Sequence, residues 1–147
     1  MRKIGYLLVI FLLAGIVSCE EVENLNKDKF TFTANGESVD YSDYAEFGTS
    51  EKDNNIIRGK NTDSTGLIIT VPEFRETRYV SDVHEVVITD NTGSDVYSSI
   101  LDAASIEVRI DSYEEGSRIE GTFSGTIYTV AEDDSLEIKD GKFRINK

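Results

Sequence analysis

The sequence predicts an all-β fold, an antiparallel β-sandwich, with a small β-barrel as the alternative. Hydrophobic residues alternate with polar ones over most of the chain, which is the period of a half-buried strand. Turn-forming residues interrupt this pattern about every eight to twelve residues. Beyond residue 28 no segment has the period of a long amphipathic helix. We therefore expect about nine short strands and little helix, in a single domain over residues 29–147.

The first strands are expected to form a hairpin. Phe and Thr alternate over residues 30–33, and Asn35-Gly36 follows. Both turn residues tolerate the positive φ that a type I′ turn requires. Val39 and Tyr41 alternate on the return strand, and Tyr44–Gly48 is predicted to be a further short strand.

The centre of the sheet is expected at Leu67–Val71. This run is continuously apolar or β-branched, as a strand buried on both faces must be. Asn55–Lys60 makes the strand before it, and the turn formers of Asn61–Gly66 separate the two. Pro72 ends the central strand, since proline cannot donate a hydrogen bond to a ladder.

The second half of the chain continues the alternation. Apolar residues recur at every second position over 106–110 and again over 119–127, so each segment should bury one face. A helical turn is expected only at Leu101–Ser105. The other expected strands are 79–80, 85–89, 96–101 and a terminal hairpin in which Leu136–Lys139 and Lys142–Ile145 are joined by Asp140-Gly141.

The N-terminus indicates a signal peptide over residues 1–18. Arg2 and Lys3 precede an uncharged run, Ile4–Ser18. As a helix this run is about 22 Å long, whereas a bilayer core is about 30 Å thick. It therefore has the length of a signal-peptide core and is too short for a transmembrane helix.

The run ends in Ile16-Val17-Ser18-Cys19, which resembles the lipobox of bacterial lipoproteins. The thiol of Cys19 would then carry a diacylglyceryl group, and its freed amine a further acyl chain. A secretory signal with a chance cysteine is the alternative, but the only Cys of the chain lies at the cleavage position. Two or three acyl chains hold a protein on a membrane essentially permanently, so the membrane is the expected partner.

Residues 19–28 form the lipidated cysteine and a polar tether. The acidic residues directly after Cys19 resemble the surface-export signal of Bacteroidota lipoproteins, while a solvated linker on a periplasm-facing protein is equally compatible. The expected location is therefore the outer membrane, with the domain exposed at the cell surface or facing the periplasm.

The composition excludes several classes of function. The net charge is -13, and it becomes -15 once Arg2 and Lys3 leave with the signal peptide. This balance argues against nucleic-acid binding, which needs cations against phosphates. It also argues against flat docking on anionic lipid and fits a domain that is held by its acyl chains and stands off the bilayer. The single Cys excludes an internal disulfide and a Cys-based zinc cluster.

Three phrases of the sequence resemble a family of small Bacteroidota lipoproteins whose domain has no assigned function. The phrases are Phe30–Gly36 (FTFTANG), Arg118–Thr126 (RIEGTFSGT) and Ile138–Phe143 (IKDGKF). The resemblance implies a β-rich outer-membrane or surface lipoprotein. It supplies no catalytic residues.

No catalytic residue or cofactor is assigned from the residues either. His84 follows Ser81-Asp82, but no G-x-S-x-G elbow accompanies them. Among 28 Asp and Glu some carboxylate pair must lie close, so a pair carries no information. A carboxylate-dependent hydrolase remains the enzymatic alternative.

Two acidic loops are candidates for calcium, because Ca²⁺ takes oxygen ligands from loops. Asp90–Asp95 offers Asp90 and Asp95, and Glu132–Asp134 offers three carboxylates. Neither loop matches the EF-hand pattern, and the same residue types also form ordinary turns.

The run Tyr41–Phe47 suggests a ligand-contacting edge with Tyr41 and Tyr44, although a strand with one face in the core is the commoner arrangement. The sequence thus predicts a lipid-anchored, non-enzymatic module that binds a protein or glycan. A carbohydrate- or lipid-binding accessory protein with a barrel cavity is the alternative.

Overall fold

A computed structural model describes residues 27–147 apart from 51, 81–84, 101–103, 130 and 132, and of Asp95 it describes the backbone only. Within these residues it contains eleven strands and one 3₁₀ helix. The strands are β1 (Lys29–Ala34), β2 (Glu37–Asp40), β3 (Glu46–Thr49), β4 (Asn55–Lys60), β5 (Gly66–Val71), β6 (Thr77–Tyr79), β7 (Glu85–Thr89), β8 (Asp95–Ser98), β9 (Ser105–Glu114), β10 (Arg118–Thr129) and β11 (Ser135–Asn146). The 3₁₀ helix is η1 (Ser42–Tyr44).

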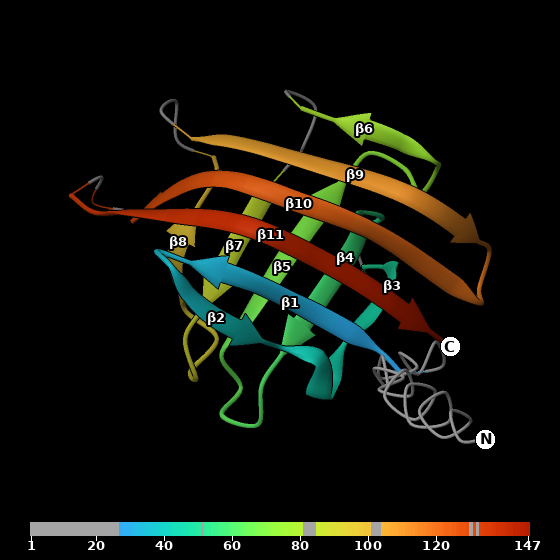
Figure 1. The fold of residues 1–147 in the computed structure, drawn as a ribbon, viewed down its shortest axis with the longest axis horizontal. Coiled ribbons are helices and arrows are strands. Elements are labelled where there is room, and N and C mark those ends of the chain that lie inside the picture. Colours follow the sequence, from blue (N-terminus) through green and yellow to red (C-terminus); the bar gives the residue numbers. More distant parts are fainter. Residues whose placement is uncertain (1–26, 51, 81–84, 101–103, 130, 132) are drawn as a thin grey trace, which may run out of the picture.

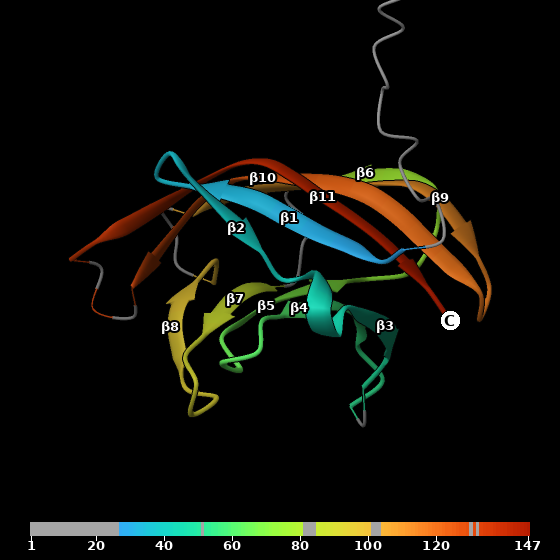
Figure 2. The ribbon, with the colours of Figure 1, turned by 60° about the horizontal axis from the view of Figure 1, so that its bottom comes forward.

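The strands form one antiparallel sheet that curls into two layers (Figures 1 and 2). The front layer has the order β2-β1-β11-β10-β9-β6, and the back layer has the order β8-β7-β5-β4-β3. Strand β10 joins the layers, because it pairs with β9 along most of its length and with β8 at Tyr128 and Thr129. The prediction of an all-β antiparallel fold is confirmed, and β2, β3 and β6 are edge strands.

The first hairpin and the central strand are also as predicted. Strands β1 and β2 pair around Asn35 and Gly36, whose φ values of 47° and 89° fit a type I′ turn. Strand β5 lies between β4 and β7, and five of its six residues are buried. Continuous hydrophobicity thus correctly identified the strand that is covered on both faces.

The core between the layers combines a cluster of phenylalanine rings from the front layer with aliphatic side chains from both layers. The ring centroid of Phe30 lies 5.4 Å from that of Phe123 and 6.5 Å from that of Phe143. Phe30 reaches across to the back layer at Gly59, where a Cβ would lie only 2.5 Å from the ring. The other fully buried large side chains are Ile57, Leu67, Ile69, Val71, Val86, Ile110, Ile119, Ile127, Ile138 and Ile145.

The predicted terminal hairpin is wrong, because β11 runs without a turn from Ser135 to Asn146. Asp140, at a φ of 53°, sits in a β-bulge where the pairing with β10 shifts register. A Cβ on Gly141 would lie 2.3 Å from the backbone oxygen of Phe123, so glycine allows the strands to approach. Asp-Gly supports either a turn or a bulge, and pairing with strands on both sides decides for the bulge.

The predicted strand Tyr44–Gly48 is wrong at its start. Residues 42–44 form η1, and β3 begins only at Glu46. The turn is stabilised by Ser42, whose backbone N–H donates to Asp40 (2.9 Å) and whose hydroxyl accepts from the N–H of Phe30 (2.8 Å). The chain crosses from the front layer to the back layer here, so it must bend.

The remaining boundaries differ by a few residues. Strand β6 covers 77–79 instead of 79–80, and β8 covers 95–98 instead of 96–101. The helical turn predicted at 101–105 lies mostly outside the described residues, and β9 already begins at Ser105.

Candidate functional site

The structure separates the two tyrosines that the sequence grouped together. Tyr41 is only 8% exposed, and its ring packs edge-on against Phe32 at a centroid distance of 5.4 Å. Burial raises the pKa of the Tyr41 hydroxyl. Tyr44, at the end of η1, is 62% exposed. Of the predicted pair, only Tyr44 is placed to touch a ligand.

Tyr44 borders an open surface groove of about 540 Å³. The groove lies where η1, the start of β1 and the end of β4 meet, so it sits at the seam between the two layers. Its lining residues are Asp28, Asp43, Tyr44, Ala45, Glu46, Arg58, Lys60, Asn61 and Ser64.

The groove combines one aromatic ring with groups of every hydrogen-bonding type. Arg58 and Glu46 form an ion pair across the β3–β4 ladder. Asn61 begins the turn after β4, and its side-chain oxygen accepts a hydrogen bond from the N–H of Thr65 (3.1 Å). Lys60 adds a cation and Ser64 a hydroxyl. Such a surface suits a ligand that presents both a flat apolar face and hydroxyl or amide groups.

The Asp90 loop is organised by its own aspartate. The Asp90 carboxylate accepts hydrogen bonds from the hydroxyl (2.7 Å) and N–H (2.8 Å) of Thr92 and from the N–H of Ser94 (3.0 Å). These bonds, that of the Thr92 hydroxyl foremost, lower the pKa of Asp90. The side chain of Asp95 lies outside the described part of the structure.

Side-chain hydrogen bonds also hold the second acidic loop, at Asp133 and Asp134. The Thr129 hydroxyl donates to Asp133 (2.7 Å), and the Tyr97 hydroxyl donates to Asp134 (3.0 Å). This last bond raises the pKa of Tyr97. Glu132 lies outside the described residues. Among the residues that are described, no three His, Cys, Asp or Glu side chains are grouped so that they could hold a metal ion.

Three other predicted features cannot be placed. Cys19, the signal peptide and His84 all lie outside the described residues. No helix within the described part of the chain is long and apolar enough to cross a membrane.

Sequence reasoning missed most of the groove. Its residues span Asp28 to Ser64 and are gathered only by the fold. One signal was present: Arg58 and Lys60 alternate with the inward-facing Ile57 and Gly59, so they had to lie together on the outer side of β4.

No family model, no curated protein and no solved structure matches this chain. A function for it therefore has to be inferred from the groove, the surface charge and the N-terminal sequence.

Proposed function

We propose that the chain is a lipid-anchored outer-membrane lipoprotein whose β domain is a non-enzymatic binding module. The anchor is supported by the uncharged segment ending in Ile16-Val17-Ser18-Cys19. The start of the fold supports a short tether. The Asp28 carboxylate accepts hydrogen bonds from the backbone N–H (2.9 Å) and side chain (3.2 Å) of Asn146. Residues 20–27 then span at most roughly 28 Å between membrane and domain.

Membership of the small Bacteroidota lipoproteins is part of this proposal. The three phrases that resemble the family fall on β1 with its turn, on β10 and on β11. These strands are neighbours in the order β1-β11-β10, with Phe143 paired to both Phe30 and Gly121. A family signature that forms one contiguous piece of sheet is easier to explain by common descent than three scattered phrases would be.

The exposed ring of Tyr44 beside the groove is the observation that carries the binding proposal. The rings of Phe30, Phe123 and Phe143 fill the space between the layers, which supports a ligand contact on the surface more than one in a barrel cavity. A glycan is the ligand class that fits best. Its ring face would stack on Tyr44, while Arg58, Asn61 and Asp43 offer donors and acceptors to its hydroxyls.

The anchor is tested by Cys19→Ala in the full chain. Because Cys19 is the only Cys, the variant has no thiol left to acylate. We expect wild type in the membrane fraction, labelled by radioactive palmitate, and the variant unlabelled and released. Retention of the variant in the membrane fraction would contradict the anchor. Protease treatment of intact cells distinguishes a surface domain from a periplasmic one.

The groove is tested on an array of immobilised polysaccharides. Tyr44→Ala should weaken binding about thirtyfold, the usual effect of truncating a central interface tyrosine. Tyr128→Ala is the matched control, because Tyr128 is half-buried on β10 and does not line the groove. An equal loss of polysaccharide binding in both variants, or no loss in Tyr44→Ala, would contradict a binding role for the groove.

A further inference from the structure

The charges of this acidic protein are distributed very unevenly. We define the outer cationic face as the solvent side of β1, β11, β10, β9 and β6. Of the 13 Lys and Arg that follow residue 26, seven lie on this face: Lys29, Arg78, Arg109, Arg118, Lys139, Lys142 and Arg144. The same strands expose six of the 20 described carboxylates: Glu107, Asp111, Glu114, Glu120, Glu137 and Asp140.

The remaining described surface therefore has six cations against 14 carboxylates. Among the described residues the negative charge therefore belongs to the rest of the surface, whereas the outer cationic face, with seven cations and six carboxylates, is slightly positive.

A row of side chains crosses this face from one edge to the other. Arg78 on β6 is paired with Arg109 on β9, Arg109 with Thr122, Thr122 with Lys142 and Lys142 with Thr31 on β1. At about 4.8 Å between strands, the row is roughly 19 Å long. Every member ends in a hydrogen-bond donor.

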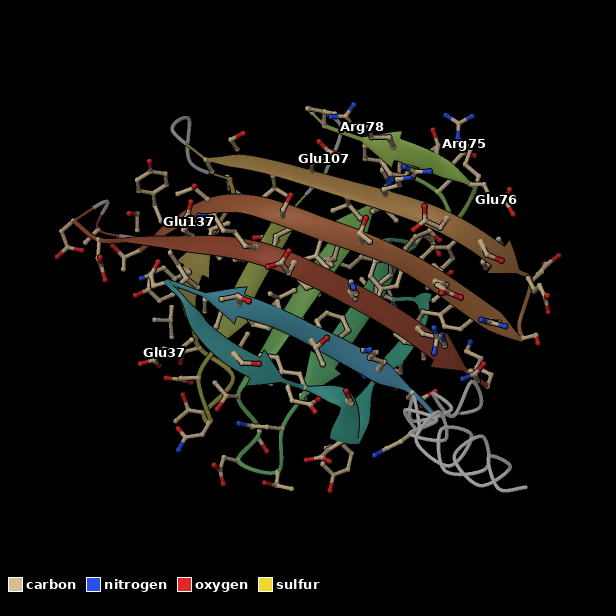
Figure 3. All side chains as sticks on the ribbon, viewed as in Figure 1. Glu37, Arg75, Glu76, Arg78, Glu107 and Glu137 are labelled. Carbon is tan, nitrogen blue, oxygen red and sulfur yellow. The ribbon has the colours of Figure 1, made fainter. Side chains whose placement is uncertain are left out.

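Two arginines directly opposite each other are unfavourable for the sheet itself. Each therefore has a neighbouring acid: Arg78 binds Glu107 (2.5 Å; Figure 3) and Arg109 binds Asp111 (2.7 Å). These pairs are largely exposed, and exposed ion pairs contribute little, so an anionic partner can replace the acids. Lys142 has no ion-pair partner among the described residues.

The chain enters the fold at the end of this face. A shallow depression there is lined by Lys27, Asp28, Lys29, Thr31, Asp40, Ser42 and Arg144. A second depression continues along the face past Lys142, Glu120 and Thr122. The segment that leads to Cys19 thus leaves the domain beside its most cationic surface.

We propose that the outer cationic face lies against the anionic headgroup phosphates of the membrane that holds the tether. This inference rests on the proposed lipid anchor. The tether keeps the face at high effective concentration next to the membrane, so weak attraction is enough to orient the domain. The acidic remainder of the surface then faces away. Whole-chain charge argued against flat docking only because it averages over two unlike surfaces.

The test uses the chain from Cys19 onward, because every described strand lies within residues 29–146. Its single thiol is coupled to a maleimide lipid, which reproduces the tether whether or not the cell lipidates Cys19. The vesicles contain phosphatidylcholine alone or with phosphatidylglycerol. Acetylation of lysines, followed by mass spectrometry, measures which side is covered.

We expect acetylation of Lys142 to slow roughly fivefold on the anionic vesicles, the usual effect of one cation near such a surface. Lys52, in the exposed β3–β4 turn, should be acetylated at the same rate on the two kinds of vesicle. Arg109→Glu should abolish the protection of Lys142, whereas Lys52→Glu makes the same charge change off the face and should leave it intact. High salt should remove the protection of Lys142 in the wild-type chain, because salt screens the attraction to the vesicle. Circular dichroism checks that both variants are folded.

Equal reactivity of Lys142 on both vesicles would overturn the inference, and fractionation of Cys19→Ala would still decide the anchor separately. Equal protection of Lys142 and Lys52 would mean adsorption without orientation and would also overturn it. Protection of Lys142 by soluble dextran sulfate but not by phosphatidylglycerol would assign the face to an anionic polysaccharide instead. Protection of Lys142 that survives Arg109→Glu would show that the row is not involved and would also overturn the inference.

Discussion

The two layers of the sheet differ in how far their outward-facing side chains are exposed to solvent. In the front layer, β9, β10 and β11 are 10 to 12 residues long and alternate buried with exposed residues. In the back layer, β5 and β7 have only six and five residues, and Thr70, Val87 and Thr89 on their outer side are under 10% exposed.

The difference shows what makes a sheet face available for binding. A strand with strict alternation exposes every second side chain, and these positions can hold charge at little cost. A strand buried on both faces cannot hold charged side chains at such positions without a large cost. The cationic row therefore lies on the front layer, and the groove lies at the seam, where η1 and the outward side chains of β4 meet.

The largest expected effect concerns the contact between the layers. Phe30→Ala should lower the free energy of unfolding by about 3–5 kcal/mol, because it empties the centre of the core. Gly59→Ala alone should cost about 1–3 kcal/mol, since its methyl would press on the Phe30 ring. In the Phe30→Ala background the same glycine change should cost almost nothing. Urea unfolding of the four proteins measures this coupling, and additive effects would mean that the layers do not meet there.

The bulge in β11 comes next. Gly141→Ala should destabilise the protein by about 1–3 kcal/mol, because the new Cβ would meet the Phe123 oxygen at 2.3 Å. Gly48→Ala on β3 is the control, since its nearest neighbour would be the Lys147 amine at 3.9 Å. Thermal unfolding compares the two. Similar melting temperatures would contradict the close approach of β10 and β11 at Gly141.

The smallest effect is on the charged surface. Partial burial acts to raise the pKa of Glu120, but hydrogen bonds from Arg118 (2.6 Å) and Arg144 (3.4 Å) outweigh it and lower the pKa. A lowered folded-state pKa stabilises the fold above the unfolded value of roughly 4.3, and this stabilisation is lost as the pH falls through the folded value. Glu120→Gln should cost up to about 1 kcal/mol at pH 7.

The pH dependence distinguishes this from a packing effect. Wild type and Glu120→Gln should converge in stability at acid pH, once the wild-type carboxyl is protonated. Glu115→Gln, in the exposed β9–β10 turn, is the control and should match wild type throughout. A Glu120→Gln deficit that persists in acid would show that the arginines do not act through charge.

The fold could be predicted from the sequence wherever a local rule was sufficient. The all-β class, the Asn35-Gly36 hairpin and the central strand each follow from periodicity or turn chemistry within a few residues. The bulge at Asp140-Gly141 could not, because the same dipeptide suits a hairpin and only pairing with β1 and β10 chooses between them.

The candidate site was less predictable for the same reason. The sequence singled out Tyr41 and Tyr44 as equals, and the turn of η1 sends one into the core and the other to the surface. The groove residues come from segments up to 36 positions apart in sequence, from Asp28 to Ser64. Nothing in a linear pattern reports such distances.

By itself, the sequence determined the strand-forming period, the net charge and the predicted anchor at Cys19, because each depends on residues that are near neighbours or simply counted. The tertiary structure decided which side of the molecule carries the cations. Five strands from the two ends and the middle of the chain bring Arg78, Arg109, Lys142 and Lys29 onto one face. The net charge does not say where on the surface the charges lie, and only the pairing of strands that are distant in sequence brings these cations to one side.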